Sequence, residues 1–124
     1  MGTSEFGLPT LEQIKNNFNL LAIVTNYDKP SGRGLKIKNS AVKEYALEKN
    51  IELLQPENLK DQNFIEKIKK FKPDFIIVVA FRMLPKVIWS IPKHGTINLH
   101  ASLLPNYRGA APINWALING EKFT

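Results

Sequence analysis

The 124-residue chain contains no cysteine, and its longest apolar run, residues 75–81, is far too short to span a membrane. The absence of cysteine excludes a disulfide framework and a cysteine-ligated zinc site. Only two histidines are present, and no carboxylates cluster with them, so we expect no metal site. No charged, apolar leader opens the sequence, which predicts no signal peptide and a location in the cytoplasm, or in an organellar matrix if the source is eukaryotic.

The positive charge of the chain is concentrated in one stretch. The formal net charge is +6, and five basic residues with no acid among them nearly account for it: Lys29, Arg33, Lys36, Lys38 and Lys43. Such a segment can contact the phosphate backbone of a nucleic acid. The alternative is an ordinary solvated loop, and charge alone favours that alternative. Tyr27 is the only aromatic residue beside the segment, which gives weak support to base stacking.

Helical and strand patterns alternate along the chain. We expect helices over 6–18, 40–49, 61–71, 85–90 and 110–119, strands over 20–25, 51–54, 75–80 and 95–100, and an irregular loop over 26–40. Strands that are apolar throughout and alternate with helices indicate a parallel sheet covered on both faces, hence an α/β fold. The first residues suit a turn after a strand, and the last close a helix where a new strand would begin. We therefore expect a fragment lacking its first strand and its later strands.

Two polar side chains lie on the last predicted strand. Asn98 and His100 are two positions apart, so they share one face of the strand, near its carboxyl end. Ligands of open parallel sheets bind beyond that end. An amide beside an imidazole can stabilise a developing oxyanion and move a proton. The alternative, favoured by spacing alone, is that nearby backbone groups satisfy both side chains.

The residues after these two strands offer further candidates. Residues 102–109, "SLLPNYRG", form a predicted loop with two exposed leucines on which a flat apolar ligand can rest, unless the loop folds onto the core. Arg82 directly follows Phe81, just past the predicted strand 75–80, and can either bind an anionic ligand or extend into solvent.

The segment "INLHASLLPNYRGAAPINWALING" resembles a signature of the methionyl-tRNA formyltransferase family, in which Asn-x-His precedes Ser-Leu-Leu-Pro and Arg-Gly-Ala-Ala-Pro. "MGTSEFGLPTL" resembles the family's first strand-to-helix turn, although Ser4 stands where proline is usual. "DKPSGRGLKIKNSAVK" resembles its tRNA-entering loop, and "VVAFRMLPK" a segment beside the folate pterin. The resemblance covers essentially the whole chain and implies a partial, Rossmann-like N-terminal formyltransferase domain over residues 1–124, without the family's C-terminal β-barrel.

The resemblance also implies an activity and a set of site residues. The family transfers a formyl group from 10-formyltetrahydrofolate to the amine of methionyl-initiator-tRNA. By this resemblance Asn98 and His100 are catalytic, while a third catalytic residue, an aspartate, lies beyond residue 124, so the fragment itself is expected to be inactive. The resemblance places folate against Ser102, Leu103, Leu104, Pro105 and Arg82, the aminoacyl end near Gly2 and Thr3, and tRNA against Arg33, Lys36 and Lys38.

Two other functions stay open at this point. One is a related folate-dependent formyltransferase, or a formyltetrahydrofolate hydrolase, that acts without tRNA. The other is a non-enzymatic RNA-binding fragment in which only the basic loop matters. The basic loop and the "RGAAPINWA" segment favour the tRNA enzyme within the wider family.

Overall fold

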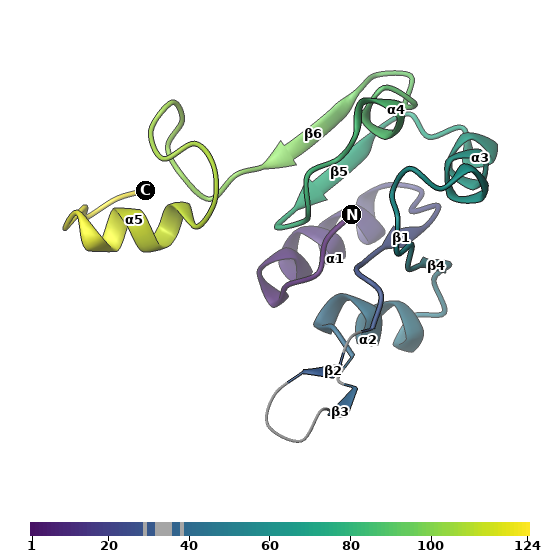
Figure 1. Cartoon of the computed structure of the whole chain (residues 1–124), viewed down its shortest axis with the longest axis horizontal. Helices are drawn as coiled ribbons and strands as arrows, with labels where there is room; N and C mark the ends of the chain where they lie inside the picture. The colour runs from purple at the N-terminus through teal and green to yellow at the C-terminus, as the bar shows by residue number, and fades with distance from the viewer. Residues whose placement is uncertain (29, 32–35, 38) are drawn as a thin grey trace.

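The computed structural model describes residues 1–28, 30, 31, 36, 37 and 39–124, with 30, 31, 36 and 37 described by their backbone alone. The helices are a 3₁₀ turn η1 (Glu5–Gly7), α1 (Leu8–Asn17), α2 (Ala41–Glu48), α3 (Gln62–Phe71), α4 (Lys86–Trp89) and α5 (Pro112–Ile118). The strands are β1 (Ile23–Val24), β2 (Pro30–Ser31), β3 (Lys36–Ile37), β4 (Leu53–Leu54), β5 (Ile76–Val79) and β6 (Thr96–Leu99). This order, visible in Figure 1, confirms the predicted α/β class.

Short polar side chains start two of the helices as the sequence predicts. Ser40 precedes α2, and its hydroxyl accepts a hydrogen bond from the Lys43 amide at 3.1 Å. Asp61 does the same for α3, accepting from the Phe64 amide at 2.9 Å. These caps satisfy amides that have no partner inside the helix. Helix α3 then turns one apolar side toward the core, burying Phe64, Ile65 and Ile68.

Two parallel strand pairs meet at the start of the chain. β1 pairs with β4, and β5 pairs with β6, in both cases in parallel. The first residues lie between the two pairs. The Gly2 amide donates to the Val24 carbonyl at 3.0 Å, and the Val79 amide donates to the Met1 carbonyl at 2.9 Å. The parallel sheet therefore runs β4, β1, the N-terminal residues, β5 and β6.

The alternation of side chains along the strands divides the core between two faces of this sheet. Val24 and Leu54 pack with α3 and α4 in one cluster, which also contains Ile76, Val78 and Ile88. Their neighbours Ile23 and Leu53 pack instead against α1 and α2. Helices therefore cover both faces of the sheet at β1 and β4, as expected for a Rossmann-like fold, whereas Ile97, Asn98 and Leu99 of the edge strand β6 are exposed.

The prediction that residues 26–40 form an irregular loop was wrong in one respect. Residues 30–31 and 36–37 form a short antiparallel pair, with Pro30 opposite Ile37. Two-residue strands are too short to show a period-two pattern, and the glycines and prolines around them indicate only turns. The pair gives residues 26–40 a two-stranded stem.

Candidate functional site

Three segments end side by side at one edge of the parallel sheet. Gly2 is bridged to Val79 in β5, and Val79 is in register with Leu99 in β6. The next residues of these segments, Thr3, Ala80 and His100, therefore leave the sheet at the same edge. Ala80 adopts a positive φ of 46°, a conformation that side chains other than glycine rarely adopt and that is often found at functional sites. The candidate residues at the two ends of the sequence thus meet at one edge.

Asn98 and His100 differ in their surroundings. Asn98 lies in β6 opposite Val78 and is exposed. Its side-chain amide makes no hydrogen bond to any described residue. His100 follows the last residue of β6 and is partly buried. Its Nε2 atom lies 2.9 Å from the backbone carbonyl oxygen of Tyr107. A carbonyl only accepts, so Nε2 carries the proton in this contact and leaves Nδ1 as the free position of a neutral ring.

The loop after β6 is closed by its own hydrogen bonds. The Ser102 hydroxyl donates to the Asn106 carbonyl at 2.8 Å. The Tyr107 hydroxyl donates to Glu121 at 2.9 Å and accepts from the Asn119 amide at 3.1 Å. Tyr107 therefore links His100, through its carbonyl, to the residues that follow α5. Sequence reasoning missed this residue because a backbone carbonyl has no sequence signal, although its place seven residues after His100 allows the contact.

The predicted folate-binding loop presents apolar surface. Leu103 and Leu104 are 64% and 59% exposed, and Pro105 is also exposed. A hollow of about 460 Å³ lies between Leu103, Asn106 and Tyr107 of the loop and the C-terminal residues 120–124. Neither Asn98 nor His100 lines this hollow. The exposed leucines are compatible with a flat apolar ligand, and their contact with folate stays a prediction.

Arg82 lies near the same edge but turns toward the end of β4. Its guanidinium donates to the carbonyl of Glu57 at 2.7 Å and also to the carbonyl of Pro56. The guanidinium also lies 5.6 Å from the centre of the Phe81 ring. Its Nε atom is buried and has no partner among the described residues. Arg82 thus braces the loop between β4 and α3, and a contact with folate remains a prediction.

Gly2 and Thr3 are fixed by the sheet. A Cβ atom on Gly2 would lie 2.8 Å from the Val79 carbonyl oxygen, so only glycine fits without movement. The hydroxyl of Thr3 is buried and has no hydrogen-bond partner among the described residues. An unpaired buried hydroxyl at the edge where ligands bind can donate a hydrogen bond to a ligand. The placement of the aminoacyl end there stays a prediction.

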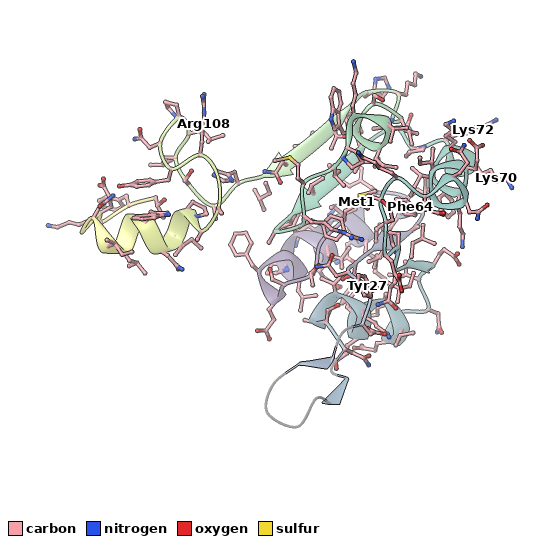
Figure 2. All side chains as sticks on the ribbon, viewed as in Figure 1. Met1, Tyr27, Phe64, Lys70, Lys72 and Arg108 are labelled. Atoms are coloured by element: carbon pink, nitrogen blue, oxygen red, sulfur yellow. The ribbon has the colours of Figure 1, made fainter. Side chains whose placement is uncertain are left out.

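The basic segment is only partly described. Arg33 and Lys38 lie outside the described residues, and Lys36 is described by its backbone alone. Lys43, the fifth basic residue of the stretch, forms an ion pair with Asp28. Figure 2 shows Tyr27, near the start of the segment, well apart from Arg108 in the loop after β6.

Two further observations concern metal ions and membranes. Within the described ranges, no group of three or more histidine, aspartate and glutamate side chains is placed to hold a metal ion. None of the described helices has the length and apolar character needed to cross a bilayer.

A family model described as formyl transferase matches residues 2–124. The chain belongs to the formyl transferase family. The chain is 62% identical to a protein of Flavobacterium johnsoniae named methionyl-tRNA formyltransferase, over all of this chain and 40% of that protein. Proteins of the same name from Bacteroides thetaiotaomicron and Clostridium tetani are 57% and 58% identical, again over the whole chain and over 39% and 41% of their own lengths.

The chain therefore spans about two fifths of the length of these formyl transferase relatives. The match confirms the family that the sequence motifs indicated. It includes the edge of the sheet at which Thr3, Ala80 and His100 meet.

Proposed function

We propose that the chain forms part of the catalytic domain of an enzyme that transfers a formyl group from 10-formyltetrahydrofolate to the amine of methionyl-initiator-tRNA, for translation initiation in the cytoplasm. The strongest support is the identity of 55–62% over the whole chain with relatives named methionyl-tRNA formyltransferase. The remaining three fifths of the relatives' length would complete the domain and supply further contacts.

The proposed chemistry takes place at the edge where β5 and β6 end. The methionine amine attacks the formyl carbon, and the carbonyl oxygen becomes a tetrahedral oxyanion. Asn98 donates its free amide to that oxygen. His100, when protonated, is a second donor to that oxygen. When the oxyanion collapses, the bond between the formyl carbon and the folate nitrogen breaks, His100 gives its proton to that nitrogen, and the neutral imidazole then takes the proton that the amine loses. The free Asn98 amide and the position of His100 one residue beyond β6 support these roles.

The proposed substrates lie on either side of this edge. The folate rests on Ser102, Leu103, Leu104 and Pro105, with Arg82 holding the neighbouring loop, and the aminoacyl end approaches Gly2 and Thr3. The exposure of the two leucines and the unpaired Thr3 hydroxyl support this arrangement. Arg33, Lys36 and Lys38 contact the phosphates of the tRNA. No metal ion takes part in the proposed reaction.

A chimaera tests the proposal. Residues 1–124 replace the matching segment of the Flavobacterium johnsoniae relative, and formylation of methionyl-initiator-tRNA is measured with 10-formyltetrahydrofolate. We expect Asn98→Ala to lower kcat by roughly 10²–10³-fold, because one oxyanion donor is lost. We expect His100→Ala to lower it by roughly 10²–10⁴-fold. Arg33→Ala should raise KM for tRNA far more than KM for folate.

Matched surface variants control for general effects. Asn19→Ala and His94→Ala remove the same side-chain types from exposed positions and should leave kcat unchanged. A chimaera that hydrolyses 10-formyltetrahydrofolate but ignores tRNA would instead support the hydrolase alternative. Full activity of Asn98→Ala and His100→Ala would leave only an RNA-binding role for this segment.

A further inference from the structure

A cluster of polar side chains joins the two ends of the basic segment, which here means residues 29–38. We call Asp28, Lys43 and Gln55 the stem clamp. Asp28 accepts hydrogen bonds from the ammonium of Lys43 and from the amide of Gln55, the latter at 3.1 Å. Gln55 also donates to the Asn26 carbonyl at 2.9 Å. The clamp therefore joins the residues before the basic segment to α2, which follows it, and to the end of β4.

A second contact, between the side chains of Thr25 and Ser40, also joins the two ends of the basic segment. Thr25 is fully buried, and its hydroxyl lies 3.1 Å from the Ser40 hydroxyl. The Thr25 amide donates to the Leu54 carbonyl at 3.0 Å, which fixes the residue to β4. Ser40 in turn caps α2. The chain thus leaves the sheet and returns to it through two side-chain contacts, at Thr25–Ser40 and at Asp28–Lys43.

The ion pair between Asp28 and Lys43 reduces the positive charge that this part of the chain offers to an anion. Four basic residues lie between Asp28 and Lys43, with no acid among them. Asp28 neutralises the fifth, Lys43, whose side chain is only 17% exposed. The hydrogen bond from Lys43 holds the pKa of the Asp28 carboxyl below its usual value, so the carboxylate stays charged at neutral pH. If charge alone mattered, the segment would bind an anion better without Asp28.

We propose that Asp28 is a positioning residue, which with Lys43 and Gln55 fixes both ends of the basic segment 29–38 for its contact with tRNA. The inference rests on the proposed function for the identity of the anion. Contacts that already hold Asp28 and Lys43 in place before RNA binds lower the ordering cost of binding. The proposal therefore predicts the opposite sign from a simple charge argument: removal of the acid should weaken binding to RNA.

The test compares two variants of the chimaera that carries residues 1–124, and both variants make the same change in charge. The unaltered chimaera is the parent chain. Asp28→Asn removes the charge within the clamp, and Asp74→Asn removes one from an exposed carboxylate near His94, away from the clamp. Binding of fluorescent initiator tRNA transcript is followed by anisotropy at several salt concentrations, with thermal melting to verify folding. We expect Asp28→Asn to weaken binding by roughly fivefold or more, and to lower the slope of log Kd against log salt as phosphate contacts are lost. Asp74→Asn should bind as tightly as the parent chain, or slightly tighter.

Limited trypsin digestion tests the clamp without RNA. Cleavage after the basic residues of 29–38 should be several-fold faster in Asp28→Asn than in the parent chain or in Asp74→Asn. Equal cleavage, or equal or tighter tRNA binding by Asp28→Asn, would overturn the inference while leaving the proposed function intact. If weaker binding follows the unfolded fraction with an unchanged salt slope, Asp28 is merely structural and the inference also fails. A parent chain that binds no tRNA would overturn both the RNA role of the clamp and the acceptor in the proposed function.

Discussion

Two regions of the molecule differ in the burial of their side chains. One is the sheet with its helices, and the other is residues 100–124, which we call the C-terminal arm. In the sheet region, Ile88 is fully buried, and side chains from both faces of the strands form two apolar clusters. In the arm only Ala116 is buried, while Trp115, Leu117 and Ile118 are 54–70% exposed. Figure 1 shows α5 beyond the end of β6, away from the other helices.

The candidate site takes residues from both regions, and the two regions hold these residues in different ways. Thr3 and Ala80 are held by strand pairing within the packed sheet. The orientation of His100 depends instead on one contact with the Tyr107 carbonyl in the arm. Core packing fixes the edge where the chemistry is proposed, whereas local hydrogen bonds fix the imidazole at that edge. Changes in the sheet should therefore alter stability, and changes in the arm should alter the site with little effect on stability.

The largest expected effect compares two isoleucines. Ile88→Ala removes a fully buried side chain and should lower the free energy of unfolding by about 2–5 kcal/mol, because it loses apolar burial and leaves a cavity. Ile118→Ala removes the same side chain from a position that is 70% exposed and should change stability by less than about 0.5 kcal/mol. Urea unfolding measures both. Equal losses would show that the face of α5 is covered in solution, and the comparison would break.

A smaller effect is expected from pH. Burial lowers the pKa of the Met1 amine from its ordinary value of 8.0 to about 6, and the amine donates to the Ile77 carbonyl at 2.5 Å. Between these values the unfolded chain binds more protons than the folded chain, so stability should fall as pH drops from 8 to 6. Two pKa units correspond to at most about 2.7 kcal/mol.

An N-acetylated chain is the control for this pH effect. Acetylation removes the titrating amine but keeps an N–H group that can donate to Ile77. The stability of the acetylated chain should therefore vary less between pH 6 and pH 8 than that of the free chain, by the amount that the amine contributes. Identical pH profiles for the two chains would mean that the Met1 amine is solvated rather than held within the sheet.

The last comparison concerns two glycines that differ in what an added side chain would meet. Gly2 has no room for a side chain, because a Cβ would lie 2.8 Å from a backbone oxygen, so Gly2→Asn should cost about 1–3 kcal/mol. Gly120, after α5, has a φ of +70° and open space around it. Asparagine adopts that conformation readily, so Gly120→Asn should be nearly neutral. Comparable losses in thermal melting would contradict this distinction between the regions.

Parts of this structure could be read from local patterns. The helices expected over 40–49 and 61–71 begin after Ser40 and Asp61, because capping depends only on neighbouring residues. The position of Asn98 and His100 near the end of a strand also followed from the two-residue period. The two-residue strands β2 and β3 could not be predicted, because their pairing involves residues too few to form a pattern.

The sequence by itself determined the alternation of strands and helices, the family, and the concentration of basic residues over 29–43, since each depends on the order of residues along the chain. Only the tertiary structure decided which distant groups meet. It brought Thr3 and His100 to the same edge of the sheet, on either side of Ala80, turned Arg82 toward the carbonyls of Pro56 and Glu57, and paired Lys43 with Asp28. These contacts join residues far apart in the sequence. They depend on the register of parallel strands and on where the connecting loops return to the sheet, neither of which is specified by neighbouring residues.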